Sequence, residues 1–266
     1  MIFETITSKQ NLRIKNIIHL QKHSERINQG VFIIEGLKEI EKAVLSDYIF
    51  DSVYFNDEIF PEEKLKDFFG KSLPGMVFKV SSDVYSRIAY RENQGGLVVL
   101  AKPKTHKAGM IKFKENPLVL VVEGVEKPGN IGAIFRTADA AGIDAVMICD
   151  PKADIYNPNA IRASLGCVFT VPSVVCSSDD GIQWLKSNNV RIFCTHLKAA
   201  KPYHEMDFTK PSAIVMGTED KGLTEIWTNE ADANIIIPMC GAADSMNVSV
   251  SAAIVIFEAK RQRNFL

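Results

Sequence analysis

Short apolar runs alternate along the chain with longer stretches in which apolar and polar residues mix at helical spacing, and this alternation is typical of an α/β protein. In the second half, the apolar runs are rich in β-branched residues and end at turn residues. This pattern favours strands that are buried on both faces of a parallel sheet. The predicted strands span residues 118–122, 145–149, 168–171, 191–195, 213–216 and 235–237. Helices are expected between them, so this half predicts a parallel sheet covered by helices.

A smaller set of alternating elements is predicted for the first 100 residues. The expected helices span 8–28, with Ser8 as the N-cap, and 36–46, and the expected strands span 31–34, 51–55, 77–80 and 97–100. The basic, proline-bearing segment 101–109 lacks apolar periodicity and is interpreted as a linker. The sequence therefore predicts two domains, residues 1–103 and 104–266, of which the first is the smaller α/β module.

The predicted first helix carries much of the positive charge of the N-terminal region. Four of its residues recur at spacings that place them on one helical stripe: Lys15, His19, Lys22 and Arg26. This stripe is either a solvated helix face or a surface that contacts phosphates. Arg87 and Arg91 belong to a second polar segment, which ends in two glycines and is either a surface turn or a nucleic-acid contact.

Composition narrows the classes of protein only slightly. The chain has 266 residues, and its formal net charge of −1 gives no overall attraction to nucleic acid, so a polyanion must be held by a local patch. No apolar run approaches the about 20 residues of a membrane span, and no signal peptide is evident, which predicts a cytoplasmic location without a membrane partner. The five cysteines are widely spaced without a C-x-x-C pair, so neither a disulfide framework nor a metal site is expected.

Three glycine-bearing segments follow predicted strands in the second half, at residues 129–136, 217–222 and 237–251. Ligands in open parallel sheets bind at the carboxyl ends of the strands, so these segments are expected to form one site. The third segment combines Pro238 and Gly241 with Ser245, Asn247 and Ser249 directly before an apolar helix. Backbone groups at a helix start, together with small polar side chains, suit the binding of a small polar cofactor.

The commoner nucleotide motifs do not fit these segments. Residues 217–222 have the glycine spacing of a Walker A loop, but Leu223 and Thr224 stand where its Lys and Ser/Thr would be, which disfavours an NTP-binding enzyme. No G-x-G-x-x-G sequence occurs, so a dinucleotide-binding turn is not indicated.

Arg136 projects away from the apolar stripe of its predicted helix, near Asn130 and Gly132. It is either a solvated side chain or a clamp for a phosphate or sugar oxygen.

Taken in order, these motifs resemble those of the SpoU (TrmH-type) RNA ribose 2′-O-methyltransferases of the SPOUT superfamily, over residues 117–263. The three motifs are Asn130-x-Gly132-x-x-x-Arg136, Gly217-x-Glu219-x-x-Gly222-Leu223, and Ile237-Pro-Met-x-Gly241 with Ser245-x-Asn247. The N-terminal part, with Asn11, Ile14 and Glu35-Gly36, is similar to the RNA-substrate-binding domain that often precedes this catalytic domain. That domain has a fold related to certain ribosomal proteins.

The resemblance implies properties that periodicity could not supply. It implies a deep trefoil knot in the C-terminal parallel-sheet domain, S-adenosylmethionine as the cofactor, an RNA substrate, and a homodimer that completes each active site. General rules of chain topology would reject a knot. By motif position, the catalytic polar set corresponds to Asn130, Arg136, Glu219, Ser245 and Asn247. The cofactor contacts correspond to Thr195, Leu197, Gly217, Ile237, Met239 and Met246.

The implied reaction needs a ribose oxygen that is aligned and partly deprotonated. Arginine stays protonated in proteins, so Arg136 is expected to stabilise the developing alkoxide and to grip a phosphate, while Glu219 orients Arg136 or balances its charge. The large N-terminal module favours 23S ribosomal RNA over tRNA as the substrate. A non-catalytic RNA-binding or ribosome-assembly protein is the other alternative, although intact Arg136, Glu219 and Asn247 argue against it.

Overall fold

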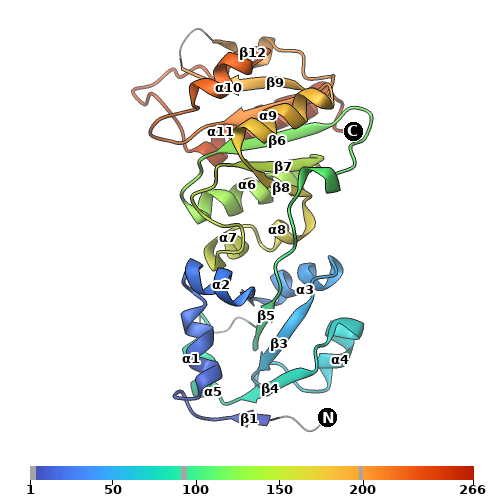
Figure 1. Ribbon diagram of the computed structural model, residues 1–266, viewed down its shortest axis with the longest axis vertical. Helices are drawn as coiled ribbons and strands as arrows, with labels where there is room; N and C mark the ends of the chain where they lie inside the picture. Colours follow the sequence, from blue (N-terminus) through green and yellow to red (C-terminus); the bar gives the residue numbers. More distant parts are fainter. Residues whose placement is uncertain (1–3, 91–94, 198–199) are drawn as a thin grey trace. The chain divides into compact units, whose positions relative to one another are not determined.

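The computed structural model describes residues 4–90, 95–197 and 200–266, which form two compact units (Figure 1). The N-terminal unit contains the described residues up to Thr105 and also Asp154–Thr170. The C-terminal unit contains His106–Ala153 and the described residues from Val171 to Leu266. Within the described residues, no helix is long and apolar enough to cross a membrane.

The N-terminal unit is built on a five-stranded sheet with the order β1-β4-β3-β5-β2. Strand β5 is antiparallel to β2 and β3, and the other neighbours are parallel. The strands are β1 (Glu4–Ile6), β2 (Phe32–Glu35), β3 (Phe50–Phe55), β4 (Met76–Val80) and β5 (Leu97–Ala101). The helices are α1 (Leu12–His19), α2 (His23–Gln29), α3 (Leu37–Leu45), α4 (Lys64–Phe69), η1 (Gly70–Ser72), α5 (Ser82–Ile88), α7 (Pro158–Ala163) and α8 (Cys167–Thr170).

An aromatic cluster attaches residues 154–170 to the N-terminal unit. Phe32 of β2 stacks on Tyr156 with 4.2 Å between ring centroids, and Tyr48 meets Phe169 edge to face at 4.9 Å. The hydroxyl oxygens of Tyr48 and Tyr156 lie 3.1 Å apart. All four rings are buried, and burial of aromatic rings contributes strongly to packing. The segment therefore belongs to the N-terminal core although it lies within the predicted second domain.

The predicted single helix over residues 8–28 is wrong, because the structure contains α1 and α2 with a break between them. Asn11, not Ser8, caps the first helix, and its side chain accepts a hydrogen bond of 2.8 Å from the backbone N–H of Arg13. At the break, the Arg26 guanidinium donates to the carbonyl oxygens of Leu20 and Gln21 at 2.9 and 2.8 Å. A buried side chain thus satisfies backbone groups that a continuous helix would have paired internally.

The strand predicted at residues 168–171 is also wrong. This apolar run forms α8, and the strand β8 begins after Pro172. A short apolar run has no periodicity that separates a buried strand from a buried helix. Here packing decided the outcome, because Phe169 is held against Phe32 and Tyr48 in the core of the N-terminal unit.

The C-terminal unit contains a seven-stranded sheet with the order β10-β12-β9-β11-β6-β7-β8, and every neighbouring pair is parallel, as predicted. The strands are β6 (Leu118–Glu123), β7 (Ala145–Cys149), β8 (Ser173–Cys176), β9 (Arg191–Thr195), β10 (Lys201–Pro202), β11 (Ser212–Met216) and β12 (Ala233–Ile236). The helices are η2 (Ala108–Met110), α6 (Pro128–Ala141), α9 (Ser178–Ser187), η3 (Tyr203–Glu205), α10 (Glu225–Glu230) and α11 (Val248–Gln262).

Helices cover both faces of this sheet. Ile182 and Leu185 of α9 and Trp227 of α10 pack on one face, in a core that includes alternate residues of β6 and β11. Helix α11 packs against α6 and β11 on the other face (Figure 1). Strand β12 is separated from β11 by β9, so segment 237–247 must return past the loops that follow β9 and β11 before α11 begins.

Candidate active site

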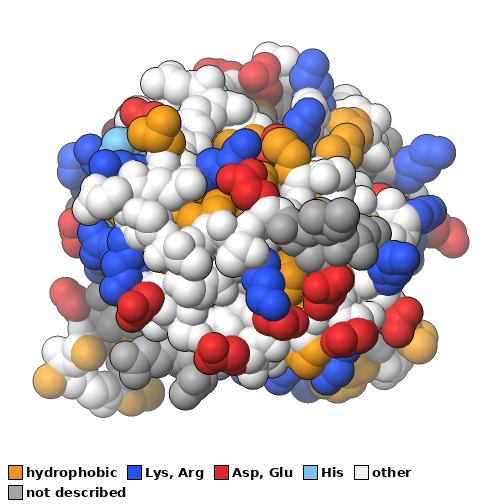
Figure 2. All heavy atoms as spheres, turned by 90° about the horizontal axis from the view of Figure 1, so that it is seen from below, with side chains coloured by type: hydrophobic (Ala, Val, Ile, Leu, Met, Phe, Trp, Pro, Cys, Tyr) orange, Lys and Arg blue, Asp and Glu red, His pale blue; other side chains and the backbone are white. Residues whose placement is uncertain are grey.

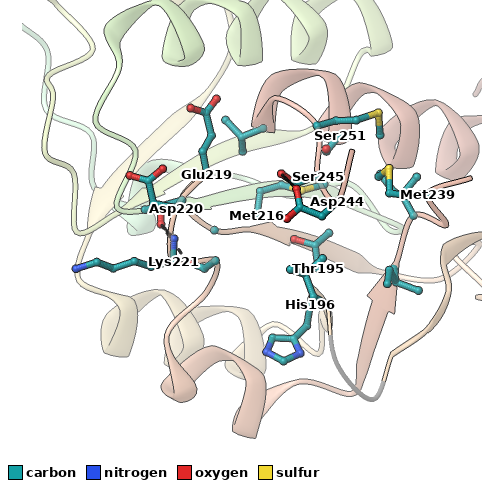
Figure 3. A pocket seen from close by; sticks show the side chains of 18 of the residues that line it. Thr195, His196, Met216, Glu219, Asp220, Lys221, Met239, Asp244, Ser245 and Ser251 are labelled. Atoms are coloured by element: carbon teal, nitrogen blue, oxygen red, sulfur yellow. Dashed lines mark hydrogen bonds between the residues drawn. The ribbon is translucent and has the colours of Figure 1, made fainter. Parts of the chain in front are cut away.

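A cavity of about 390 Å³ lies at the carboxyl ends of β9, β11 and β12 (Figure 3). Its walls come from the loop after β9, the loop after β11, and the segment between β12 and α11. Figure 3 shows one side chain from each of these three segments around the same cavity: Thr195, Glu219 and Ser245. All residues predicted as cofactor contacts line the cavity: Thr195, Leu197, Gly217, Ile237, Met239 and Met246. Its size falls within the about 300–1,000 Å³ that is usual for small-molecule sites.

The loop after β11 is a tight turn that only glycine permits at its start. Thr218 and Gly222 pair across it through two backbone hydrogen bonds of 3.1 and 3.0 Å. A Cβ atom on Gly217 would lie 2.1 Å from the Gly222 carbonyl carbon and 2.3 Å from the Leu223 nitrogen. These distances are far below van der Waals contact, so any side chain at position 217 would force the turn open. The glycine spacing that resembles a Walker A loop has this steric origin.

The three sequence motifs meet in one hydrogen-bond network beside the cavity. Asn130 at the start of α6 donates from Nδ2 to Oε1 of Glu219 at 3.1 Å. Asn247, the N-cap of α11, donates from Nδ2 to the same Glu219 oxygen at 2.6 Å and to Oδ1 of Asn130 at 3.1 Å. Oδ1 of Asn247 in turn accepts from the backbone N–H and the hydroxyl of Ser249. Residues 117 positions apart in the chain are therefore joined at one point.

Lys127 completes this network, and sequence reasoning missed it. Its Nζ donates to Oε2 of Glu219, the oxygen that the two asparagines leave free. The hydrogen bonds from Lys127 and Asn130 hold the pKa of Glu219 below its ordinary range, and Glu219 raises the pKa of Lys127. Glu219 is thus an ionised acceptor rather than a base poised near neutral pH. The only sequence signal was that Lys127 immediately precedes Pro128, a residue suited to the first turn of a helix.

Arg136 lies apart from this network within the single chain. It is an exposed residue of α6 and lines neither this cavity nor the smaller one beside Asn130. Among the described residues it makes no hydrogen bond or ion pair. The expected pairing of Glu219 with Arg136 is therefore absent from these residues, because Lys127, Asn130 and Asn247 occupy the carboxylate. Ser245 lines the cavity, and its hydroxyl donates to Oδ1 of Asp244 at 3.4 Å.

Glu123 anchors the far end of the loop after β11, and it too escaped sequence reasoning. This last residue of β6 is only 5% exposed. It accepts hydrogen bonds from the backbone N–H and the hydroxyl of Thr224 at 2.8 and 2.6 Å, and from the Ser178 hydroxyl at 3.2 Å. A carboxylate at the end of an apolar strand gives no recognisable signal in the sequence, because its partners are 55 and 101 residues away.

The residues predicted to contact nucleic acid differ in their exposure to solvent. Lys15 and Lys22 are exposed, and Arg87 is exposed in the last turn of α5, whereas Arg91 lies outside the described residues. The prediction for Arg26 is wrong: it is 4% exposed and pairs with Asp154 at 2.5 Å, so its guanidinium is not presented to a phosphate. The helix break also removes the continuous stripe. On the face shown in Figure 2, Lys and Arg side chains are interspersed with Asp and Glu rather than gathered in one broad patch.

No group of His, Cys, Asp and Glu side chains within the described ranges is placed to hold a metal ion. The site is instead a largely apolar cavity with backbone groups of a glycine turn on one side and a charged network on the other. These features define an α/β protein with a site for a small organic cofactor at the carboxyl edge of a parallel sheet.

Comparison with known proteins identifies the family. Residues 117–257 match the SpoU rRNA Methylase family, and residues 11–99 match the MRM3-like substrate binding domain. The first match covers more than half of the chain, and the chain therefore belongs to the SpoU rRNA methylase family.

The similarity to one relative and two solved structures extends over nearly the whole length of this chain. The chain is 29% identical over 255 residues to the 23S rRNA (guanosine(2553)-2′-O)-methyltransferase RlmP of Bacillus subtilis, covering 96% of this chain and 98% of RlmP. It is similar to the crystal structure of an RNA 2′-O ribose methyltransferase, with a TM-score of 0.83, 36% identity, and coverage of 98% and 99% of the two chains. It is also similar to an AdoMet-bound rRNA methyltransferase from Sinorhizobium meliloti, with a TM-score of 0.89, 29% identity, and coverage of 97% and 98%.

Proposed function

We propose that this protein transfers a methyl group from S-adenosylmethionine to a ribose 2′-hydroxyl of 23S ribosomal RNA. The observation that carries the proposal is the meeting of Asn130, Glu219 and Asn247 beside a cavity of cofactor size. The relative RlmP, which acts on 23S rRNA by its name, aligns with both units of the chain. We assign residues 1–103 to RNA binding and 104–266 to catalysis, in keeping with the ranges matched by the two families.

The cavity fits the adenosyl group of the cofactor. Gly217, Ile237 and Met246 would present backbone groups to it, while Thr195, Leu197 and Met239 would form its walls. The absence of a Cβ at Gly217 is the feature that keeps the turn closed enough to form this wall. When bound, the sulfonium of S-adenosylmethionine supplies the methyl group.

The polar network would position the ribose beside this cofactor. Asn130 and Asn247 are fixed by Glu219, and Ser245 lines the adjoining wall, so a sugar hydroxyl would meet prearranged polar groups. Positioning of this kind can supply about 7–11 kcal/mol of the barrier in favourable cases. Arg136 would stabilise the negative charge that develops on the ribose oxygen and grip the neighbouring phosphate through its planar fork.

We further propose a homodimer and a knotted C-terminal segment. Arg136 is exposed and outside the cavities of its own chain, so a second copy would bring it to a neighbouring site. Helix α11, which packs beside α6, also leaves Val250 and Phe257 48% and 41% exposed, a pair of apolar side chains that such an interface would cover. The return of segment 237–247 past two earlier loops supports the knot.

Mapping of ribose methylation tests the reaction and the substrate together. Total RNA from cells with and without the protein is compared, and purified protein is incubated with radiolabelled S-adenosylmethionine and RNA from the deficient cells. One 23S rRNA site should lose its methyl group in the deficient cells and regain it in vitro. Label that enters only tRNA would favour the tRNA alternative. Cofactor binding by calorimetry without any methyl transfer would favour the non-catalytic one.

A further inference from the structure

We propose that Lys127 is a positioning residue for methyl transfer, which fixes the Glu219 carboxylate so that this carboxylate fixes the amide groups of Asn130 and Asn247. The inference rests on the proposed function for its kinetic test, and on the observed network for its physical basis. Lys127 lies outside the three motifs that the sequence revealed.

The division of hydrogen bonds on Glu219 makes Lys127 distinct from an ordinary surface lysine. Oε2 accepts from Lys127, and Oε1 accepts from Nδ2 of both Asn130 and Asn247. Rotation of the carboxylate would therefore break both amide contacts at once. Asn130 lies in the first turn of α6 and Asn247 caps α11, so one carboxylate sets the side-chain orientation at the starts of two helices.

Of the lysines that line the small cavity beside the network, Lys127 is the one bonded to Glu219. A cavity of about 70 Å³ beside the network is lined by Lys127, Lys152, Lys221, Glu126, Asp220 and Glu219. Lys152 is paired with Glu126 instead. With three cations and three anions around this space, removal of Lys127 would leave Glu219 in a locally negative setting. The pKa of Glu219, now lowered first by Lys127, would then rise.

A purely structural role would have a different signature. Lys127 is 71% exposed, and ion pairs of such exposed side chains contribute little to the free energy of unfolding. Its loss should therefore leave the melting temperature nearly unchanged. The effect should fall on the turnover number, because catalytic groups act only in a narrow range of positions.

The kinetic test compares Lys127→Ala and Lys127→Arg with Lys152→Ala, a control whose lysine lines the same small cavity without touching Glu219. The acceptor is total RNA from cells that lack the protein. Lys127→Ala should lower kcat about 10- to 100-fold, the size that a displacement of about 1 Å can produce, while the Kd for S-adenosylmethionine changes little. Lys127→Arg should restore most of kcat, and Lys152→Ala should resemble the wild type.

The pH profile and a double variant sharpen the result. A raised pKa of Glu219 means that the carboxylate is protonated at higher pH, so the acid limb of kcat should shift to higher pH in Lys127→Ala. Lys127→Ala should have no further effect when combined with Glu219→Gln. An unchanged kcat, a loss confined to KM for RNA, a loss that Arg does not restore, or additive effects in the double variant would each overturn the proposal.

A spectroscopic measurement keeps the proposal testable even if methyl transfer is not observed. In 15N-labelled protein, the Nδ2 signals of Asn130 and Asn247 are assigned from the Asn130→Asp and Asn247→Asp variants. Both signals should follow the ionisation of Glu219, and their midpoint should move to higher pH in Lys127→Ala but not in Lys152→Ala. Equal midpoints would refute the positioning role. Shifted midpoints in a protein without methyl transfer would refute the proposed function while leaving the network intact.

Discussion

Two single residues, Arg136 and Gly217, are expected to matter to methyl transfer for contrasting reasons. The role proposed for Arg136 rests on charge and on a planar pair of donors that no other side chain reproduces. Gly217 acts through the atoms it lacks, since a Cβ would collide with the Gly222–Leu223 peptide. Both residues belong to the sequence motifs, but only the structure reveals why position 217 must be glycine.

Replacement of Arg136 by lysine should separate catalysis from cofactor binding. A lysine keeps the positive charge but cannot make two parallel hydrogen bonds to developing negative charge. Arg136→Lys should therefore slow methyl incorporation about 100-fold or more, the usual cost of losing one such donor. Calorimetry should show an almost unchanged Kd for S-adenosylmethionine, because Arg136 does not line the cavity. Turnover like that of the wild type would contradict this role.

Replacement of Gly217 by alanine should weaken the binding of the cofactor, which Arg136→Lys should leave almost unchanged. The added methyl group would open the turn between Thr218 and Gly222 and disturb the wall of the cavity, so S-adenosylmethionine should bind at least about tenfold more weakly, a loss of about 1.4 kcal/mol. Gly129→Ala is the matched control, because a Cβ at position 129 meets no atom within 4 Å. Calorimetry on both variants tests the prediction, and equal affinities would show that the turn tolerates a side chain.

At the scale of elements, strand ends and helix starts hold the loops in place. Glu123 at the end of β6 fixes Thr224, directly before α10, while Lys127 and Asn130 at the start of α6 reach the same loop from its other end. The loop after β11 is thus clamped at both ends by side chains from the β6–α6 segment. The sequence predicted β7 and β9 with their observed bounds, but not these clamps.

Removal of the Glu123 carboxylate should destabilise the C-terminal unit. Glu123→Ala would remove the acceptor of the Thr224 N–H and hydroxyl, whereas the Ser178 hydroxyl would keep its bond of 2.6 Å to Asp150. The free energy of unfolding in urea should fall by about 2 kcal/mol, as expected when hydrogen bonds to a charged acceptor are lost. S-adenosylmethionine binding should weaken as the loop loosens. Glu115→Ala, at an exposed position, should change stability by less than about 0.5 kcal/mol, and an equal loss in both variants would contradict the anchoring role.

At the scale of the whole molecule, segment 154–170 is the feature that reading along the chain could not place. It lies between β7 and β8 in sequence, yet it packs in the N-terminal unit through Tyr156, Phe169 and the pair between Asp154 and Arg26. Arg26 is therefore part of the core that joins this segment to the N-terminal unit, whereas Lys15 and Lys22 remain exposed.

RNA binding by the N-terminal unit should depend on the exposed lysines. Lys15→Ala combined with Lys22→Ala should weaken RNA binding and reduce the slope of log K against log salt by about 1–2, because each phosphate contact releases counterions. Thermal unfolding of this double variant should match the wild type. Arg26→Ala should instead lower the free energy of unfolding by about 3 kcal/mol, since it removes a buried guanidinium from two backbone carbonyls and from Asp154, which keeps, within the described residues, only the exposed His23 ring at 2.6 Å. An unchanged salt slope in the double lysine variant would assign both residues to solvation.

The sequence by itself determined the α/β class, the parallel sheet and the glycine-bearing segments, because apolar periodicity and glycine spacing are local properties of the chain. The predicted cofactor contacts that line the cavity came from the resemblance of the three motifs to a known family. The tertiary structure decided the split of the first helix, the helical state of residues 167–170, the burial of Arg26 and the partners of Glu219. These outcomes depend on contacts between residues far apart in sequence, and for the helix split on the pairing that holds Arg26 against Asp154. Such contacts are selected by packing and by the need to pair buried polar groups, which no local pattern records.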